Sequence, residues 1–158
     1  MGLARRLLIR YPTRVSSGAD MCKILIADRN RHVRDLLRRE LAAEGYRVEV
    51  AADGREVLSR INGDDPPNLL ILDLEIPYLD EPEICARLKD CQPPLPLVIH
   101  TLLPQPLTSR AFPLAAAFLE KKGDTDLLKA VVAEVLGKYY PQGFSAREAL
   151  GGRPRPPG

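Results

Sequence analysis

Several features that mark membrane proteins, secreted proteins and metal-binding modules are missing from this 158-residue sequence. No apolar run approaches the ~20 residues that a membrane-spanning helix needs. The opening residues 1–10 are basic and apolar, but the apolar part is too short for a signal peptide. The three cysteines, Cys22, Cys85 and Cys91, form no CxxC pair and no metal-binding spacing. This pattern indicates reduced thiols in a cytoplasmic protein.

Motifs of common enzyme classes are missing as well. No GxGxxG follows the first predicted strand, where residues 28–31 read Asp-Arg-Asn-Arg instead. His32 falls on a predicted helix and His100 within a predicted strand, and no serine or cysteine stands in a recognisable nucleophile motif. We therefore predict a protein that is not an enzyme, and a flavodoxin-like enzyme or nucleotide binder is the weaker alternative.

Charge divides the chain into three parts. Residues 1–20 carry a net +3 and residues 141–158 a net +2, so the total of +2 leaves −3 on residues 21–140. A mildly acidic body argues against binding to nucleic acid. Length and a hydrophobic content of 45% predict one domain over 21–140. We expect 1–20 to be a disordered extension and 141–158 a disordered tail.

Strand-like and helix-like segments alternate along that domain. Five strands are predicted at residues 23–28, 46–50, 68–73, 97–101 and 116–119. Helices are predicted after Asn30, Asp53, Asp80 and Asp124, which are residue types that cap helix N-termini. Prolines at 104, 106 and 113 confine the fourth of five helices to about 107–112, since proline costs about 3 kcal/mol inside a helix. We expect that helix to be short or distorted.

This alternation predicts an α/β fold with a parallel sheet and helices on both faces. In such a sheet, ligands bind outside the carboxyl ends of the strands. Asp28 and Asp73 end the first and third predicted strands, Thr101 ends the fourth, and Lys121 follows the fifth. These four side chains should therefore converge on one edge.

Together with Ile76-Pro77 just after Asp73, this spacing resembles the receiver domain of two-component response regulators, over about residues 23–138. The resemblance implies a flavodoxin-like (βα)5 doubly wound parallel sheet with strand order 2-1-3-4-5. It also implies that Asp73 accepts a phosphoryl group from a histidine kinase, a phosphotransfer protein or a small acyl phosphate. Asp28, Asp73 and the backbone carbonyl of Glu75 would hold Mg²⁺, and Lys121 would pair with the phosphoryl oxygens.

The same resemblance gives Thr101 and Phe118 a switching role. The Thr101 hydroxyl would donate a hydrogen bond to the phosphoryl group, and Phe118 would turn inward when Thr101 moves. Each residue also has a purely structural interpretation, because a strand-terminal Asp often caps a helix and a threonine or lysine is ordinary in a strand or on a surface. Their joint occurrence in register favours the receiver interpretation.

Two departures from the family pattern touch the expected site. Arg29 replaces the second of two adjacent acidic residues, which should weaken Mg²⁺ binding or abolish it, and its guanidinium could pair directly with Asp73. Lys122 replaces the proline whose cis peptide aims the family's lysine, so Lys121 could point elsewhere. Tyr78 and Glu81 stand where the family favours glycine, which should alter the loop after Asp73.

Two functions of different classes follow. The leading one is a stand-alone receiver in a phosphorelay, with Asp73 as phosphoacceptor and output by contact with a downstream protein, without direct contact to nucleic acid or membrane. The alternative is a phosphorylation-silent pseudo-receiver that acts as a constitutive protein-interaction module, and Arg29 and Lys122 motivate it. A homodimer remains open for either.

Overall fold

The computed structural model describes residues 22–92, 94–102 and 112–141. Five strands form one parallel sheet in the order β2-β1-β3-β4-β5, which confirms the predicted class and strand order. They are β1 (Lys23–Ala27), β2 (Arg47–Ala51), β3 (Leu69–Leu72), β4 (Leu97–Thr101) and β5 (Ala117–Glu120). Each strand lies within one residue of its predicted place at either end, because short apolar runs between turn residues leave little freedom in their bounds.

Four helices are described, and each begins at its predicted cap. They are α2 (Arg31–Ala43), α3 (Gly54–Ile61), α4 (Glu81–Asp90) and α6 (Thr125–Tyr139). The side chains of Asn30, Asp53, Asp80 and Asp124 each accept a hydrogen bond from a backbone N–H of the first helical turn. Gly45 follows α2 with φ of 100°, the left-handed conformation that glycine adopts without strain.

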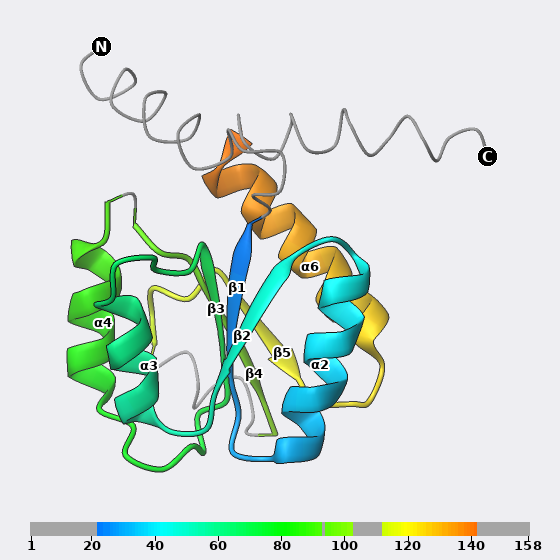
Figure 1. The fold of residues 1–158 in the computed structure, drawn as a ribbon, viewed down its shortest axis with the longest axis horizontal. Coiled ribbons are helices and arrows are strands. Elements are labelled where there is room, and N and C mark those ends of the chain that lie inside the picture. The colour runs from blue at the N-terminus through cyan, green and yellow to red at the C-terminus, as the bar shows by residue number, and fades with distance from the viewer. Residues whose placement is uncertain (1–21, 93, 103–111, 142–158) are drawn as a thin grey trace.

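The sheet lies between two helical layers. Figure 1 shows α2 and α6 on one face and α3 and α4 on the other. Alternate residues of each inner strand therefore enter different cores: Ile24 and Ile71 pack with α2 and α6, whereas Leu25 and Leu72 pack with α3 and α4. Since β1 and β3 are buried on both faces, an apolar run without alternation is what the fold requires there.

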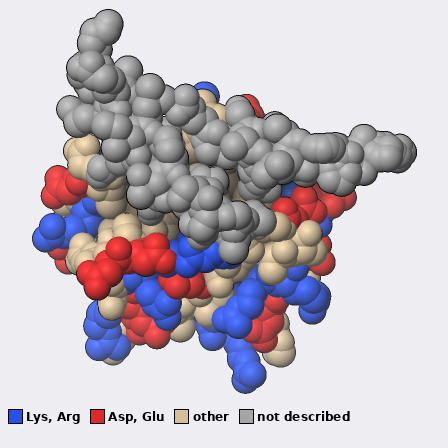
Figure 2. Space-filling model, turned by 45° about the horizontal axis from the view of Figure 1, so that its top comes forward, with Lys and Arg blue, Asp and Glu red and all other residues tan. Residues whose placement is uncertain are grey.

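Some sequence-based expectations lie outside the described residues. They concern the extension at 1–20, nearly all of the tail at 141–158, and the fourth helix at 107–112, of which only Phe112 is described. Phe112 itself is fully buried against the α3 and α4 core. Within the described ranges, no helix is both long and apolar enough to cross a bilayer. On the face seen in Figure 2, basic and acidic side chains are interspersed.

A buried cation at the amino end of β1 was not foreseen. The Lys23 ammonium pairs with Glu49 at 3.2 Å and with Asp65 at 3.1 Å, and its side chain is only 4% exposed. Arg60 and Arg47 provide further cations for the same two carboxylates. This network ties β1, β2 and the loop before β3 together at the sheet edge opposite to the predicted site.

Candidate functional site

Two buried carboxylates stand side by side at the carboxyl edge of the sheet. β1 and β3 pair in parallel with Ala27 opposite Leu72, so the next residues, Asp28 and Asp73, emerge together. The backbone N–H of Asp73 donates to the Ala27 carbonyl at 2.9 Å and continues this ladder. Both aspartates are only 1% exposed. Burial of two neighbouring carboxylates requires a cation between them.

Lys121 provides that cation. Its Nζ lies 2.7 Å from Asp28 Oδ2 and 3.0 Å from Asp73 Oδ2. We expected that Lys122, in place of a proline, could redirect Lys121, but the structure aims the lysine at both carboxylates. The backbone explains this, because the Lys121 N–H donates to the Thr101 carbonyl at 3.0 Å and extends the ladder between β4 and β5. Lys122 points to solvent and pairs with Glu120.

Uncharged donors complete the surroundings of the two carboxylates. The Thr101 hydroxyl donates to Asp73 Oδ1 at 3.3 Å, and the backbone N–H of Glu75 donates to the same oxygen at 3.1 Å. The backbone N–H of Asn30 donates to Asp28 Oδ1 at 2.8 Å. Asp28, Asp73, Thr101 and Lys121, which the sequence placed on one edge, are thus brought into direct contact.

Arg29 takes a different partner from the one we considered. Its guanidinium pairs with Glu75 Oε1 at 3.1 Å, and within the described part of the chain it forms no ion pair with Asp73. The cation that pairs with both Asp28 and Asp73 is Lys121. Arg29 therefore lies at the rim of the site, with its side chain 51% exposed.

The donor set fits a hydrated Mg²⁺ ion. Asp28 Oδ2 and Asp73 Oδ2 converge on a single cationic atom, which shows that both can face one positive centre. Among the described residues no group of three or more His, Cys, Asp or Glu side chains is placed to hold a metal. Mg²⁺ often uses one or two carboxylates and retains several waters, so these two with the Glu75 carbonyl would suffice.

One residue of the loop after Asp73 departs from ordinary backbone geometry. Tyr78 has φ of 55°, in the left-handed region that glycine favours. Its ring lies against the Arg55 guanidinium, 3.8 Å from centroid to Cζ, and remains largely exposed. The neighbouring Pro77 carbonyl accepts the Gly54 N–H at 2.9 Å. The loop is therefore held against the start of α3.

Phe118, the predicted switch residue, is partly buried. It packs against the core on the side of α3 and α4, and its register partner in β4 is Ile99. Thr101 and Phe118 lie on neighbouring strands, and Phe118 precedes the register partner of Thr101, Glu120, by two residues. The switching role itself stays a prediction.

Sequence reasoning did not identify His100 as a member of this neighbourhood. Its Nδ1 is buried without a hydrogen-bond partner among the described residues. Burial lowers the pKa of His100 below the ordinary 6.5, and the positive charge of Lys121 lowers it further, against the opposing effect of Asp28 and Asp73. The sequence places His100 within a predicted strand, and no local signal indicates the charged residues that lie near it.

A lowered pKa for His100 makes stability depend on pH. Below about pH 6.5 the unfolded chain takes up this proton before the folded chain does, so acidification favours unfolding. We expect the free energy of unfolding to fall between pH 7 and pH 5, and to fall less in His100→Gln. Denaturant unfolding across this range measures the slope, with the exposed His32→Gln as control. Equal slopes in wild type and His100→Gln would contradict the assignment.

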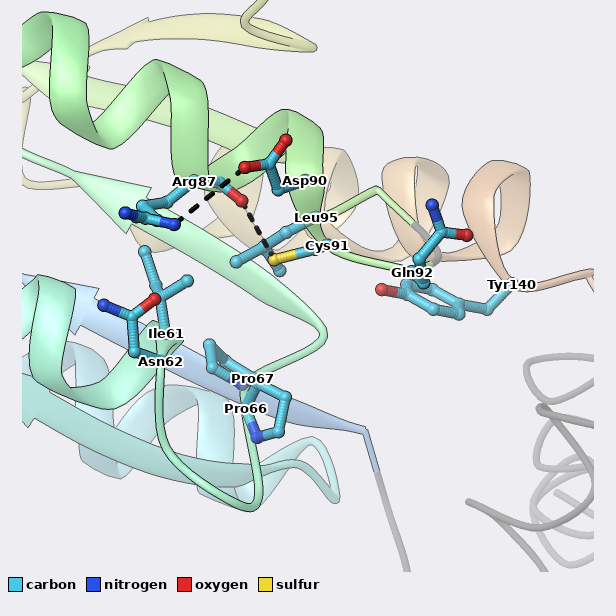
Figure 3. A pocket seen from close by; sticks show the side chains of 10 residues that line it. All are labelled: Ile61, Asn62, Pro66, Pro67, Arg87, Asp90, Cys91, Gln92, Leu95 and Tyr140. Carbon is cyan, nitrogen blue, oxygen red and sulfur yellow. Dashed lines mark hydrogen bonds and ion pairs between the residues drawn. The ribbon is translucent and has the colours of Figure 1, made fainter.

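A pocket at the opposite end of the sheet lacks comparable chemistry. It lies among the C-terminal parts of α3, α4 and α6, and Figure 3 shows its lining. The Cys91 thiol donates to the Arg87 carbonyl at 3.2 Å, and burial raises the pKa of this thiol. Arg87 is itself paired with Glu83 at 3.0 Å. Among the described residues that line it, the pocket thus offers neither an activated nucleophile nor an unpaired cation.

This chain is similar in sequence to known proteins. Residues 24–133 match the response regulator receiver domain family. The response regulator MprA of Mycolicibacterium vanbaalenii is 43% identical over 79 residues, which are 50% of this chain and 34% of that protein. MprA of Mycobacterium tuberculosis shows the same values. The aligned part of the chain thus spans about a third of the length of these relatives.

Solved structures show the same architecture. The response regulator TrrA of Thermotoga maritima, solved in complex with Mg²⁺ and BeF, is 29% identical with a TM-score of 0.63, covering 73% of this chain and 100% of that chain. A CheY-like receiver domain protein of Methanospirillum hungatei shares the fold, at 24% identity and a TM-score of 0.70 over 77% of this chain and 98% of that chain. The chain therefore belongs to the response regulator receiver domain family.

Proposed function

We propose that this chain accepts a phosphoryl group on Asp73 as the receiver of a two-component phosphorelay. The observation that supports this most is the convergence of Lys121 Nζ and the Thr101 hydroxyl on the buried Asp73 carboxylate. A carboxylate buried this deeply is poorly solvated, and its partners are those that a phosphoryl group needs.

In the proposed reaction a carboxylate oxygen of Asp73 attacks the phosphorus of a phosphohistidine or a small acyl phosphate. A P–O bond to Asp73 forms while the bond to the donor breaks, and the donor keeps the electron pair. Negative charge spreads over three phosphoryl oxygens, where Lys121 supplies a cation and Thr101 a hydroxyl donor. Mg²⁺, held by Asp28, Asp73 and the Glu75 carbonyl, would neutralise further charge. We expect its binding to be weak because of Arg29.

The proposal also covers the domain bounds, the cellular location, the phosphoryl donor and the output. We infer a receiver body over residues 21–140, cytoplasmic phosphorylation by a histidine kinase or phosphotransfer protein, and output through contact with another protein. Receiver domains are signalling modules, and we propose no catalytic turnover for this one. The relatives are longer than the matched stretch, so their wider activities are not transferred to this chain.

Incubation with acetyl phosphate and Mg²⁺ tests the central claim. We expect intact-mass spectrometry to show addition of one phosphoryl group to the wild-type chain and none to Asp73→Asn, because the amide lacks the nucleophilic carboxylate. Asp80→Asn is the matched control: it is the same substitution at the cap of α4, where asparagine caps equally well. Absence of an adduct on the wild type would instead favour the silent interaction module.

A further inference from the structure

The Arg29–Glu75 ion pair connects the two loops that carry the aspartates. Arg29 directly follows Asp28, and Glu75 follows Asp73 by two residues. The Glu75 backbone N–H donates to Asp73 Oδ1 at 3.1 Å, while its side chain holds the Arg29 guanidinium at 3.1 Å. Arg29 is thus bound to a residue that itself touches the proposed phosphoacceptor.

Hydrogen bonds hold the backbone around Arg29 in place, whereas the Arg29 side chain is partly exposed to solvent. The Asn30 N–H donates to Asp28, and Arg34 Nη1 donates to the carbonyls of Asp28 at 2.8 Å and Arg29 at 3.2 Å. The Arg29 side chain is 51% exposed, and that of Glu75 is 29% exposed. An ion pair this exposed stabilises its geometry only weakly, so a more highly charged anion nearby can displace Glu75.

A phosphoryl group on Asp73 would be such an anion. It carries about −1.5 to −2 charges at neutral pH and three acceptor oxygens, against one charge on Glu75. A guanidinium presents five N–H donors in a planar fork and binds phosphate through two of them at once. From this geometry we propose that Arg29 is a phosphoryl-binding residue that exchanges Glu75 for the phosphoryl group on Asp73.

This inference rests on the proposed function and adds a second cation to it. Arg29 then neutralises part of the negative charge on the phosphoryl group directly. A further acidic residue at this position would act indirectly, by holding the Mg²⁺ ion that neutralises this charge. The exchange also releases the Glu75 carboxylate at the surface of the loop before α4. Phosphorylation therefore leaves the Glu75 carboxylate on that loop without its Arg29 partner.

Rates of phosphoryl uptake test the role of Arg29. With acetyl phosphate at saturating Mg²⁺, we expect Arg29→Gln to reduce the initial rate at least about tenfold, since loss of one charge-stabilising donor commonly costs 10²–10³. Arg29→Lys should retain part of the rate, because it keeps the charge but loses the fork. Glu75→Gln should raise the rate, because it removes the competing anion. Arg31→Gln is the control, as Arg31 is 81% exposed and pairs with Asp35.

A binding measurement provides a readout other than activity. In chain labelled with ¹⁵N at arginine, we expect beryllium fluoride with Mg²⁺ to shift the Arg29 Nε–Hε resonance in wild type but not in Asp73→Asn. If wild type is phosphorylated but Arg29→Gln reacts as fast as Arg31→Gln and no arginine resonance shifts, the inference is overturned while the proposed function stands. If wild type shows no adduct at all, both are overturned.

Discussion

Replacement of Gly54 by alanine is expected to lower the free energy of unfolding by about 2–4 kcal/mol, an overpacking effect at the upper end of the usual range. A Cβ atom at position 54 would lie 2.0 Å from the Tyr78 carbonyl oxygen and 2.8 Å from its carbonyl carbon. These are backbone atoms, so they cannot rotate away as a side chain would. The loop after Asp73 would have to leave the start of α3.

Gly63→Ala is the matched control for this substitution. A Cβ there would lie 3.4 Å from the Ser59 carbonyl oxygen and 3.6 Å from the Arg60 carbonyl oxygen, which are ordinary contacts. Urea unfolding of the two variants and wild type should show a large loss for Gly54→Ala and little change for Gly63→Ala. Equal stability of all three proteins would show that the Pro77–Asp80 loop yields at no cost, contrary to the packing described.

Gly54→Ala should also remove one hydrogen bond from Asp73. The Gly54 N–H holds the Pro77 carbonyl, and the segment that leads to Pro77 includes Glu75, whose N–H donates to Asp73. A displaced loop therefore removes one donor from the phosphoacceptor. In contrast, the contacts of Lys121 and Thr101 come from β4 and β5 and should persist.

Arg29→Asp is expected to raise the affinity for Mg²⁺ by at least about tenfold. The substitution changes the charge at the rim of the site by two units, and unit charges 4 Å apart interact by about 1 kcal/mol in bulk water and 4 kcal/mol near a protein surface. A tenfold change requires only about 1.4 kcal/mol. The new carboxylate would also offer a third acidic oxygen donor beside Asp28 and Asp73. Isothermal titration calorimetry at fixed ionic strength measures the effect.

Two further variants test whether the gain in Mg²⁺ affinity arises at the site itself or from the changed net charge of the protein. Arg31→Asp makes the same charge change two residues away, where the side chain faces solvent and pairs with Asp35, and should alter Mg²⁺ affinity little. Asp28→Asn should abolish the gain in the double variant with Arg29→Asp. Unchanged affinity in Arg29→Asp would mean that the metal ligands are other residues than those assigned.

Most of the fold could be predicted because its signals are local. Runs such as 69–72 and 97–99 are apolar throughout, and Asn30, Asp53, Asp80 and Asp124 mark helix starts by their side-chain chemistry alone. The alternation of strands and helices then restricts the sheet to few topologies. The four central site residues followed, since parallel strands bring their carboxyl ends to one edge.

What could not be predicted depends on contacts between distant segments. The sequence suggested that Arg29 could reach Asp73, but it contained no sign that Lys121 would occupy that space and leave Glu75 as the partner. The buried nitrogen of His100 and the close approach of Gly54 to Tyr78 depend on side-chain and loop placement in three dimensions. Neither leaves a pattern in neighbouring residues.

The position of Lys121 has a consequence for local opening of the protein. β5 is an edge strand with only partly buried or exposed residues, whereas β3, which carries Asp73, is buried throughout. Edge strands detach at lower free-energy cost than central ones. Fraying of β5 would withdraw the ammonium from both aspartates while β1 and β3 stay folded. Asp73 can therefore lose its ion pair with Lys121 while the core stays folded. The rate of hydrogen exchange at the Lys121 amide would measure how often β5 opens in this way.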